Sequence, residues 1–176
     1  MPTSVPVASN VVYVLNAGGA GNVTGFDFQD GRLTMIAGST RPLSGSSVAP
    51  AQVQLTRDAT RLVVSERASN RLSTYTVDAA GFAAGPTAFA SSGVTPFGFA
   101  IRNDLVVVSE AFGGAADASA VSSYALGRDG SLTTLSPSVG TTETAACWLV
   151  ITNDGRYAYA ANAGSGTISG YAISQG

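Results

Sequence analysis

The sequence predicts an all-β fold, because helical patterning is missing and one strand–turn–strand motif recurs four times along its 176 residues. No window of eleven or more residues has apolar side chains spaced as one face of a helix requires. Short β-branched runs separated by Gly, Asn and Ser turns recur instead. This pattern is typical of β-hairpins.

The four expected hairpins lie at equivalent places in a repeat. Each begins with a β-branched or aromatic run ending in Asn or Glu, and it returns in an alternating run that contains an aromatic residue. The hairpins cover residues 11–28, 61–77, 105–126 and 157–173. Their first strands end at Asn16, Glu66, Glu110 and Asn162, which are 50, 44 and 52 residues apart. A period of this length indicates a repeat architecture.

Two more short strands complete each repeat. A run before each hairpin supplies a first strand, and runs such as residues 32–36 and 131–135 supply a fourth. Four antiparallel strands per repeat are typical of a β-propeller blade. We therefore predict a single partial β-propeller domain over residues 1–176, with blades at about 2–45, 46–92, 93–140 and 141–176. The last blade is expected to lack its outer strand. A β-sandwich does not explain the four-fold repeat, and a parallel β-helix has a shorter period.

Composition excludes several classes of function. The chain has no histidine, and all nine of its basic residues are arginine, with a net charge of −2. Catalysis through histidine, imidazole zinc sites and lysine Schiff bases are therefore excluded. Nucleic acid is not an expected partner, because nine scattered arginines form no basic patch. A membrane is not expected either, because the longest aliphatic or aromatic run, residues 11–15, is far below the ~20 residues of a spanning helix. No secretory signal is visible, and the compartment is left open.

Two carboxylates are the candidate catalytic residues. Glu66 and Glu110 occupy matching strand ends in adjacent repeats, each after a Val-Ser pair. Two carboxylates held together over a channel could share a proton, position a water molecule or hold a divalent cation. No other cofactor or metal is expected. The alternative is structural, with Glu66 pairing with Arg67 or Arg71 and capping a turn.

The candidate substrate-binding residues suit an anionic small molecule. Arginine binds carboxylates and phosphates in a bidentate manner, and a tryptophan could form the floor under a sugar or aromatic ligand. The predicted residues are Arg41, Gln52, Arg67 and Trp148. For Trp148 the alternative is packing between blades. Asn16 and Asn162 are expected mainly as turn residues, and the single cysteine, Cys147, as a buried core residue.

Some motifs resemble those of a known family. Val12-Tyr13-Val14-Leu15-Asn16 and Ala158-Tyr159-Ala160-Ala161-Asn162 are similar to the "YVTN" motif of the lactonase-family propellers, which include 6-phosphogluconolactonase and carboxymuconate-lactonising enzymes. The segment 152–157 resembles the "SPDGRYLY" turn of that family, and 145–148 resembles an "ATCW" motif of its actinobacterial-type members. The resemblance implies a seven-bladed propeller about twice as long, of which this chain matches a central four-blade segment.

Two functional hypotheses follow from the resemblance and the residues together. The first is a lactonase-family propeller that binds or hydrolyses a small anionic lactone or sugar acid. The second is a non-catalytic binding or scaffold propeller, favoured because the family's inner strands often carry a histidine where this chain has Pro50-Ala51-Gln52-Val53. For assembly, the expectation is a homodimer that closes an eight-blade ring, or completion by further blades.

Overall fold

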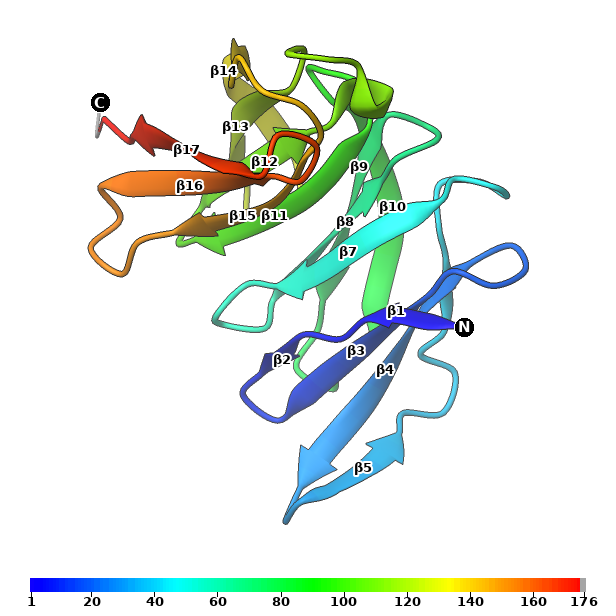
Figure 1. Ribbon diagram of the computed structural model, residues 1–176. Helices are drawn as coiled ribbons and strands as arrows, with labels where there is room; N and C mark the ends of the chain where they lie inside the picture. Colours follow the sequence, from blue (N-terminus) through cyan, green and yellow to red (C-terminus); the bar gives the residue numbers. More distant parts are fainter. Residues whose placement is uncertain (175–176) are drawn as a thin grey trace.

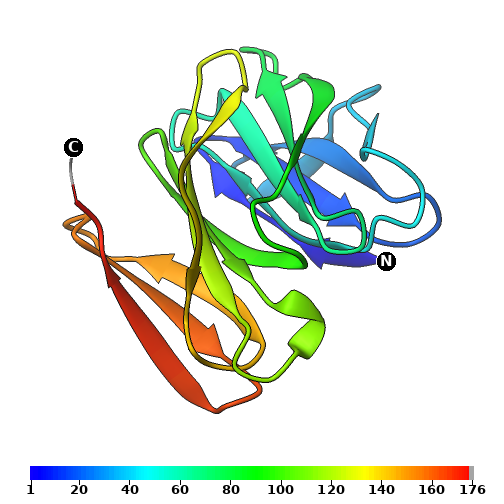
Figure 2. The same cartoon turned by 90° about the horizontal axis from the view of Figure 1, so that it is seen from above.

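The computed structural model describes residues 1–174 and confirms the all-β prediction. Four antiparallel sheets follow one another along the chain and fan out as the blades of a propeller-like arc (Figure 1). Seen from above, the N-terminal and C-terminal blades lie at the two ends of the fan (Figure 2). Among residues 1–174 no helix is long and apolar enough to cross a membrane.

The first blade is the most irregular, because its innermost and outermost strands are both split. The order β1-β3-β4-β5 forms the main sheet, with β2 beside β3 and β6 beside β4. The strands are β1 (Pro2–Ser4), β2 (Val7–Ala8), β3 (Val11–Asn16), β4 (Asn22–Gln29), β5 (Arg32–Met35) and β6 (Arg41–Pro42).

The second and third blades each have four strands in simple meander order. The second contains β7 (Pro50–Leu55), β8 (Arg61–Glu66), β9 (Arg71–Val77) and β10 (Ala83–Ala90). The third contains β11 (Pro96–Arg102), β12 (Leu105–Glu110), β13 (Ala120–Leu126) and β14 (Leu132–Gly140), with a short 3₁₀ turn at Phe112–Gly114. The fourth sheet has three strands within the described residues: β15 (Ala146–Ile151), β16 (Tyr157–Asn162) and β17 (Thr167–Ala172).

Similar turns lead into the second strands of blades 2 and 4. In blade 2 the Thr56 hydroxyl donates a 2.6 Å hydrogen bond to Asp58, whose carboxylate also accepts from the Thr60 amide at 3.2 Å. The Thr56 bond is the main cause that lowers the pKa of Asp58 to about 2. Ala59 completes the turn with a φ of 57°, and Gly155 takes the same place in blade 4 with a φ of 75°. The turn predicted from residues 152–157 therefore occurs in two blades.

The core is divided into layers between consecutive blades. Three clusters of buried apolar side chains fill the junctions of blades 1 and 2, blades 2 and 3, and blades 3 and 4. At the first junction, for example, Tyr13 of β3 packs with Leu62 and Val64 of β8. Because side chains alternate along a strand, each second strand sends one set of residues to the preceding blade and the other set to the following one.

Buried polar side chains also join neighbouring blades. The Tyr13 hydroxyl donates a 2.6 Å hydrogen bond to the Gly81 carbonyl of the next blade. Arg61, almost fully buried, donates to Asp104 at 2.7 Å and to the Leu126 carbonyl at 3.1 Å. These bonds fix the angle between neighbouring blades, and with it the arrangement of the inner strands.

Candidate functional site

The inner strands β7, β11 and β15 pack side by side and form the concave side of the arc. A groove of about 420 Å³ runs along them. Its polar lining residues are Gln52, Gln54, Arg102, Thr152 and Asn153. A small polar molecule can therefore be accommodated on this side of the molecule.

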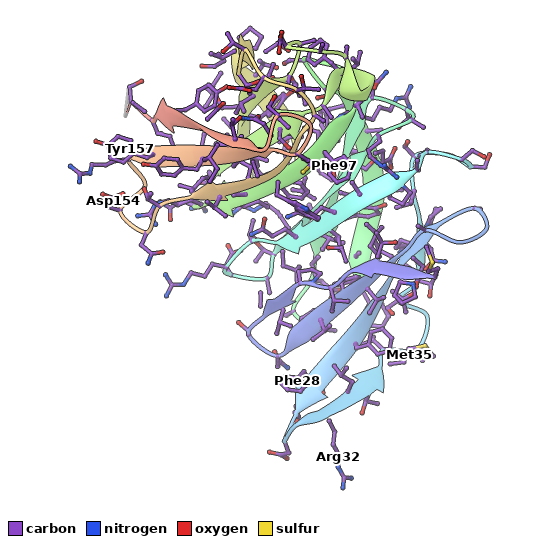
Figure 3. The ribbon with its side chains drawn as sticks, in the orientation of Figure 1. Phe28, Arg32, Met35, Phe97, Asp154 and Tyr157 are labelled. Atoms are coloured by element: carbon purple, nitrogen blue, oxygen red, sulfur yellow. The ribbon has the colours of Figure 1, made fainter. Side chains whose placement is uncertain are left out.

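A stack of one cation and two aromatic rings lies where β11 and β15 begin. The Arg67 guanidinium is 5.0 Å from the centre of the Phe97 ring. Phe97 in turn meets Trp148 edge to face, with ring centres 5.8 Å apart (Phe97 is labelled in Figure 3). Three blades contribute one residue each, and 52 % of the Trp148 surface is exposed. The structure thus brings together two predicted binding residues, Arg67 and Trp148, through a third that sequence reasoning missed.

Arg67 retains free donors in this stack. Its Nε donates to the Ala49 carbonyl at 3.3 Å, while no described residue accepts a hydrogen bond from its terminal nitrogens. A guanidinium over an aromatic face is held in orientation by the ring, and its terminal N–H groups suit a carboxylate or phosphate. The arrangement can therefore bind an anion beside an exposed aromatic surface.

Glu66 lies in a closed cage of donors. Its side chain is fully buried, and it accepts hydrogen bonds from the Ser44 amide at 3.0 Å, from Ser73 at 2.8 Å and from Ser69 at 2.9 Å. The Ser44 hydroxyl also donates to it. The carboxylate therefore fixes the loop between blades 1 and 2 to the strand ends of blade 2.

Glu110 has the same arrangement one blade further on. It is fully buried and accepts from Ser91 at 3.1 Å, from the Gly93 amide at 2.7 Å, from Ser122 at 2.6 Å and from Ser138 at 2.7 Å. Ser73 and Ser122 hold equivalent places in their blades. The repeated motif is thus a strand-end glutamate bound by hydroxyls of its own blade and of the loop before it.

The two glutamates do not share a hydrogen-bond partner, and neither lines the groove. The expectation that they act together over a channel therefore has no counterpart in the described contacts, and their catalytic role stays a prediction. Neither carboxylate accepts a hydrogen bond from Arg67 or Arg71. The structural alternative is therefore right that Glu66 caps a turn and wrong that it pairs with an arginine. Within residues 1–174 no group of three acidic, histidine or cysteine side chains is placed to hold a metal ion.

Arg41 and Gln52 both join adjacent blades through backbone groups. Arg41 donates to the carbonyl of Ala83, at the start of the outer strand β10, at 2.6 Å and to two nearby carbonyls of its own blade. The Gln52 amide makes a paired contact with the Phe99 backbone, donating at 2.8 Å and accepting at 2.9 Å. The described contacts therefore do not bring Arg41 together with Arg67, whereas Gln52 borders the groove.

The asparagines at the matching strand ends have local partners. Asn16 donates to Asn22 at 2.9 Å, and the buried Asn162 donates to Ser169 at 2.9 Å. Cys147 is half-buried and its thiol makes a 3.8 Å contact with the Ala161 carbonyl. Arg102, in the groove, was not predicted as a site residue. The signal available in the sequence was its place at the end of an inner strand.

Known proteins resemble this chain in structure only. No protein-family model matches it, and no curated protein matches it. Two solved structures described as putative 6-phosphogluconolactonases are similar, from Bacteroides uniformis (TM-score 0.78, 17 % identity, covering 98 % of this chain and 53 % of that one) and Bacteroides fragilis (0.75, 15 %, 99 % and 54 %). A functionally unknown protein from Desulfotomaculum acetoxidans is also similar (0.71, 16 %, 98 % and 56 %).

These likenesses show a lactonase-like propeller fold. At 15–17 % identity they say nothing of activity. The chain spans about half the length of these structures.

Proposed function

We propose that this chain binds a small anionic lactone or sugar acid at the stack of Arg67, Phe97 and Trp148. The observation that carries the proposal is a guanidinium held at 5.0 Å over an aromatic ring, with terminal nitrogens that no described residue occupies. The exposed Trp148 ring beside it offers the flat apolar surface on which a sugar ring packs. The lactonase-like fold agrees with a ligand of this class.

Binding is better supported than hydrolysis. The chain has no histidine, and the general bases predicted from the sequence are Glu66 and Glu110. Each is fully buried and accepts four hydrogen bonds, so neither can reach a water molecule in the groove without leaving its cage. This observation favours the second candidate function, a non-catalytic binding propeller, over a lactone hydrolase.

Titration of the fluorescence of Trp148, the single tryptophan, tests the binding proposal with gluconate and 6-phosphogluconate as ligands and glucose as the neutral control. We expect the anions to change the emission and glucose to have little effect. Arg67→Gln should weaken anion binding by roughly tenfold or more, because a hydrogen bond to a charged group contributes about 1.5–3 kcal/mol.

The matched control is Arg32→Gln, which removes an exposed arginine from β5 of blade 1. Figure 3 labels Arg32 at the end of the molecule away from Phe97, so a small ligand held at the Phe97 stack does not contact it. Binding should therefore be unchanged in this variant. Equal losses in the two variants, or no response of the native chain to either anion, would refute the site.

A further inference from the structure

The two end blades of the arc each expose an apolar face. The exposed side of blade 4 also carries Trp148, which contacts Phe97 of blade 3. Its other exposed apolar residues are Val150, Tyr157, Tyr159 and Ile168, with Val150 at 60 % and Ile168 at 72 % exposure. Cross-strand pairing of Val150 with Tyr159, and of Ala161 with Ile168, places them on one side of the sheet. We call this set the blade 4 face. Tyr157 is labelled in Figure 3 at the start of β16.

The corresponding set on blade 1 consists of Val7, Phe28, Leu33 and Met35. Val7 pairs with Val12, Val12 with Phe26, Phe26 with Met35 and Phe28 with Leu33, so these residues also share one side of their sheet. Val7 and Met35 are each 59 % exposed. Figure 3 labels Phe28 and Met35 on this end blade, far from blade 4. We call this set the blade 1 face.

The three junctions inside the chain follow one packing rule. At each junction, one residue from the second strand of a blade packs between two residues from the second strand of the next blade. Counted back from the strand-end Asn or Glu, the first residue is three places away. Its two partners are two and four places away from the strand end of their own blade. Val63 of blade 2 thus packs with Val106 and Val108 of blade 3. Val107 of blade 3 packs in the same way with Ala158 and Ala160 of blade 4.

The two end faces are the unmatched halves of this same junction. Tyr159 is the residue of blade 4 that the rule would send to a following blade, yet its side chain is 42 % exposed, whereas its counterparts Val63 and Val107 are buried. Val12 and Val14 are the residues of blade 1 that the rule would offer to a preceding blade; Val12 is buried, Val14 is half-buried, and the exposed residues of this side are those of the blade 1 face. Both end faces are therefore apolar and lie on the sides that the rule assigns to a further junction.

We propose that the blade 4 face packs against the blade 1 face of a second copy of this chain, and reciprocally, so that two chains close a ring of eight blades. The two faces of one chain lie at opposite ends of the arc, with blades 2 and 3 between them (Figures 1 and 2), so one arc does not bring them together. Two copies have about the length of one of the similar solved structures, of which this chain covers 53–56 %. Contiguous apolar faces of this kind typically mark protein interfaces.

Light scattering after size-exclusion chromatography measures the assembly directly. The native 176-residue chain, of 17.6 kDa, should elute with twice that mass. Val150→Glu and Val7→Arg should each shift it to the monomer mass. Both residues lie on inner strands, which contact one another at the existing junctions. A buried unpaired charge costs about tenfold in affinity per junction, and about a hundredfold for the two junctions of the ring.

Mixing the two variants provides the decisive experiment. A heterodimer of Val150→Glu with Val7→Arg has one native junction and one in which glutamate meets arginine, so the doubled mass should return. This rescue also shows that each variant chain is folded. Val94→Arg is the matched control, since Val94 is 43 % exposed and lies on neither face; this variant should stay dimeric.

Three results would overturn the proposal. A native chain of monomer mass would mean that the faces stay open, that the chain closes on itself or that other blades cover them. A dimer that survives both substitutions would lie on another surface. A mass that grows with concentration beyond two chains would mean open head-to-tail polymerisation rather than a closed ring.

Discussion

Glu66 and Glu110 show at the residue scale how a charged side chain becomes a structural element. Each carboxylate gathers four donors from the loop before its blade and from its own blade. Every donor is a hydroxyl or a backbone amide, so no cation is enclosed with the carboxylate. A fully buried group of this kind is tolerated only when its hydrogen bonds are complete.

Removing either carboxylate should therefore destabilise the fold. We expect Glu110→Ala to lower the free energy of unfolding by about 3 kcal/mol, because it leaves several buried donors without acceptors, and Glu110→Gln to lower it by about half as much. The equivalent Glu66 variants should lower the free energy of unfolding by similar amounts. Urea denaturation measures the effect, with the partly exposed Glu143→Gln as a control that should stay within about 0.5 kcal/mol of the native value.

The same glutamine variants decide the catalytic prediction. If the folded Glu66→Gln and Glu110→Gln proteins keep whatever lactone turnover the native chain shows, neither residue is a base. A loss of turnover without a change in stability would instead support the catalytic assignment and contradict the structural one.

At the scale of single elements, the approach of β11 to β15 depends on one glycine. A side chain at Gly98 would overlap the Cys147 carbonyl oxygen and come within 2.8 Å of the Trp148 Cα atom. The junction of blades 3 and 4 thus requires the absence of a Cβ atom at this position. Because Trp148 lies directly across from Gly98, any displacement of the two strands should also change the environment of the Trp148 ring.

Gly98→Ala should consequently cost about 1–3 kcal/mol of stability and shift the fluorescence of the single tryptophan. Gly140→Ala is the matched control, because nothing lies within 4 Å of the added methyl group. Thermal unfolding followed by tryptophan emission measures both effects. Equal behaviour of the two variants would show that the inner strands can separate without cost.

The strand pattern could be predicted from the sequence, since the paired runs and the turns between them are local. All four hairpins form where the repeated motif predicts them. The environment of the glutamates could not be predicted from the sequence, because Ser44 lies 22 residues from Glu66 and Ser138 lies 28 residues from Glu110. Phe97 was missed for the same reason: its partners Arg67 and Trp148 belong to two other blades.

At the scale of the whole molecule, stability is not expected to be uniform along the arc. Blades 2 and 3 are packed on both faces, whereas blades 1 and 4 are packed on one. Blade 4 also has three strands within the described residues, and its second strand contributes only Ala158 and Ala160 to the core. In a repeat architecture, where stability is close to a sum of units and their interfaces, these end blades should open first.

Hydrogen exchange of the Val150→Glu variant, which we expect to be monomeric, should reveal this gradient. We expect the slowest exchange in β8 and β12, faster exchange in β3 and the fastest in β16 and β17, because local opening needs the loss of only one apolar interface at the ends. If the native chain is a closed ring, protection of β16 and β17 should rise towards that of β12 when the native protein is measured under the same conditions. Uniform protection across all four blades of the variant would contradict the layered core and indicate that the arc unfolds as one cooperative unit.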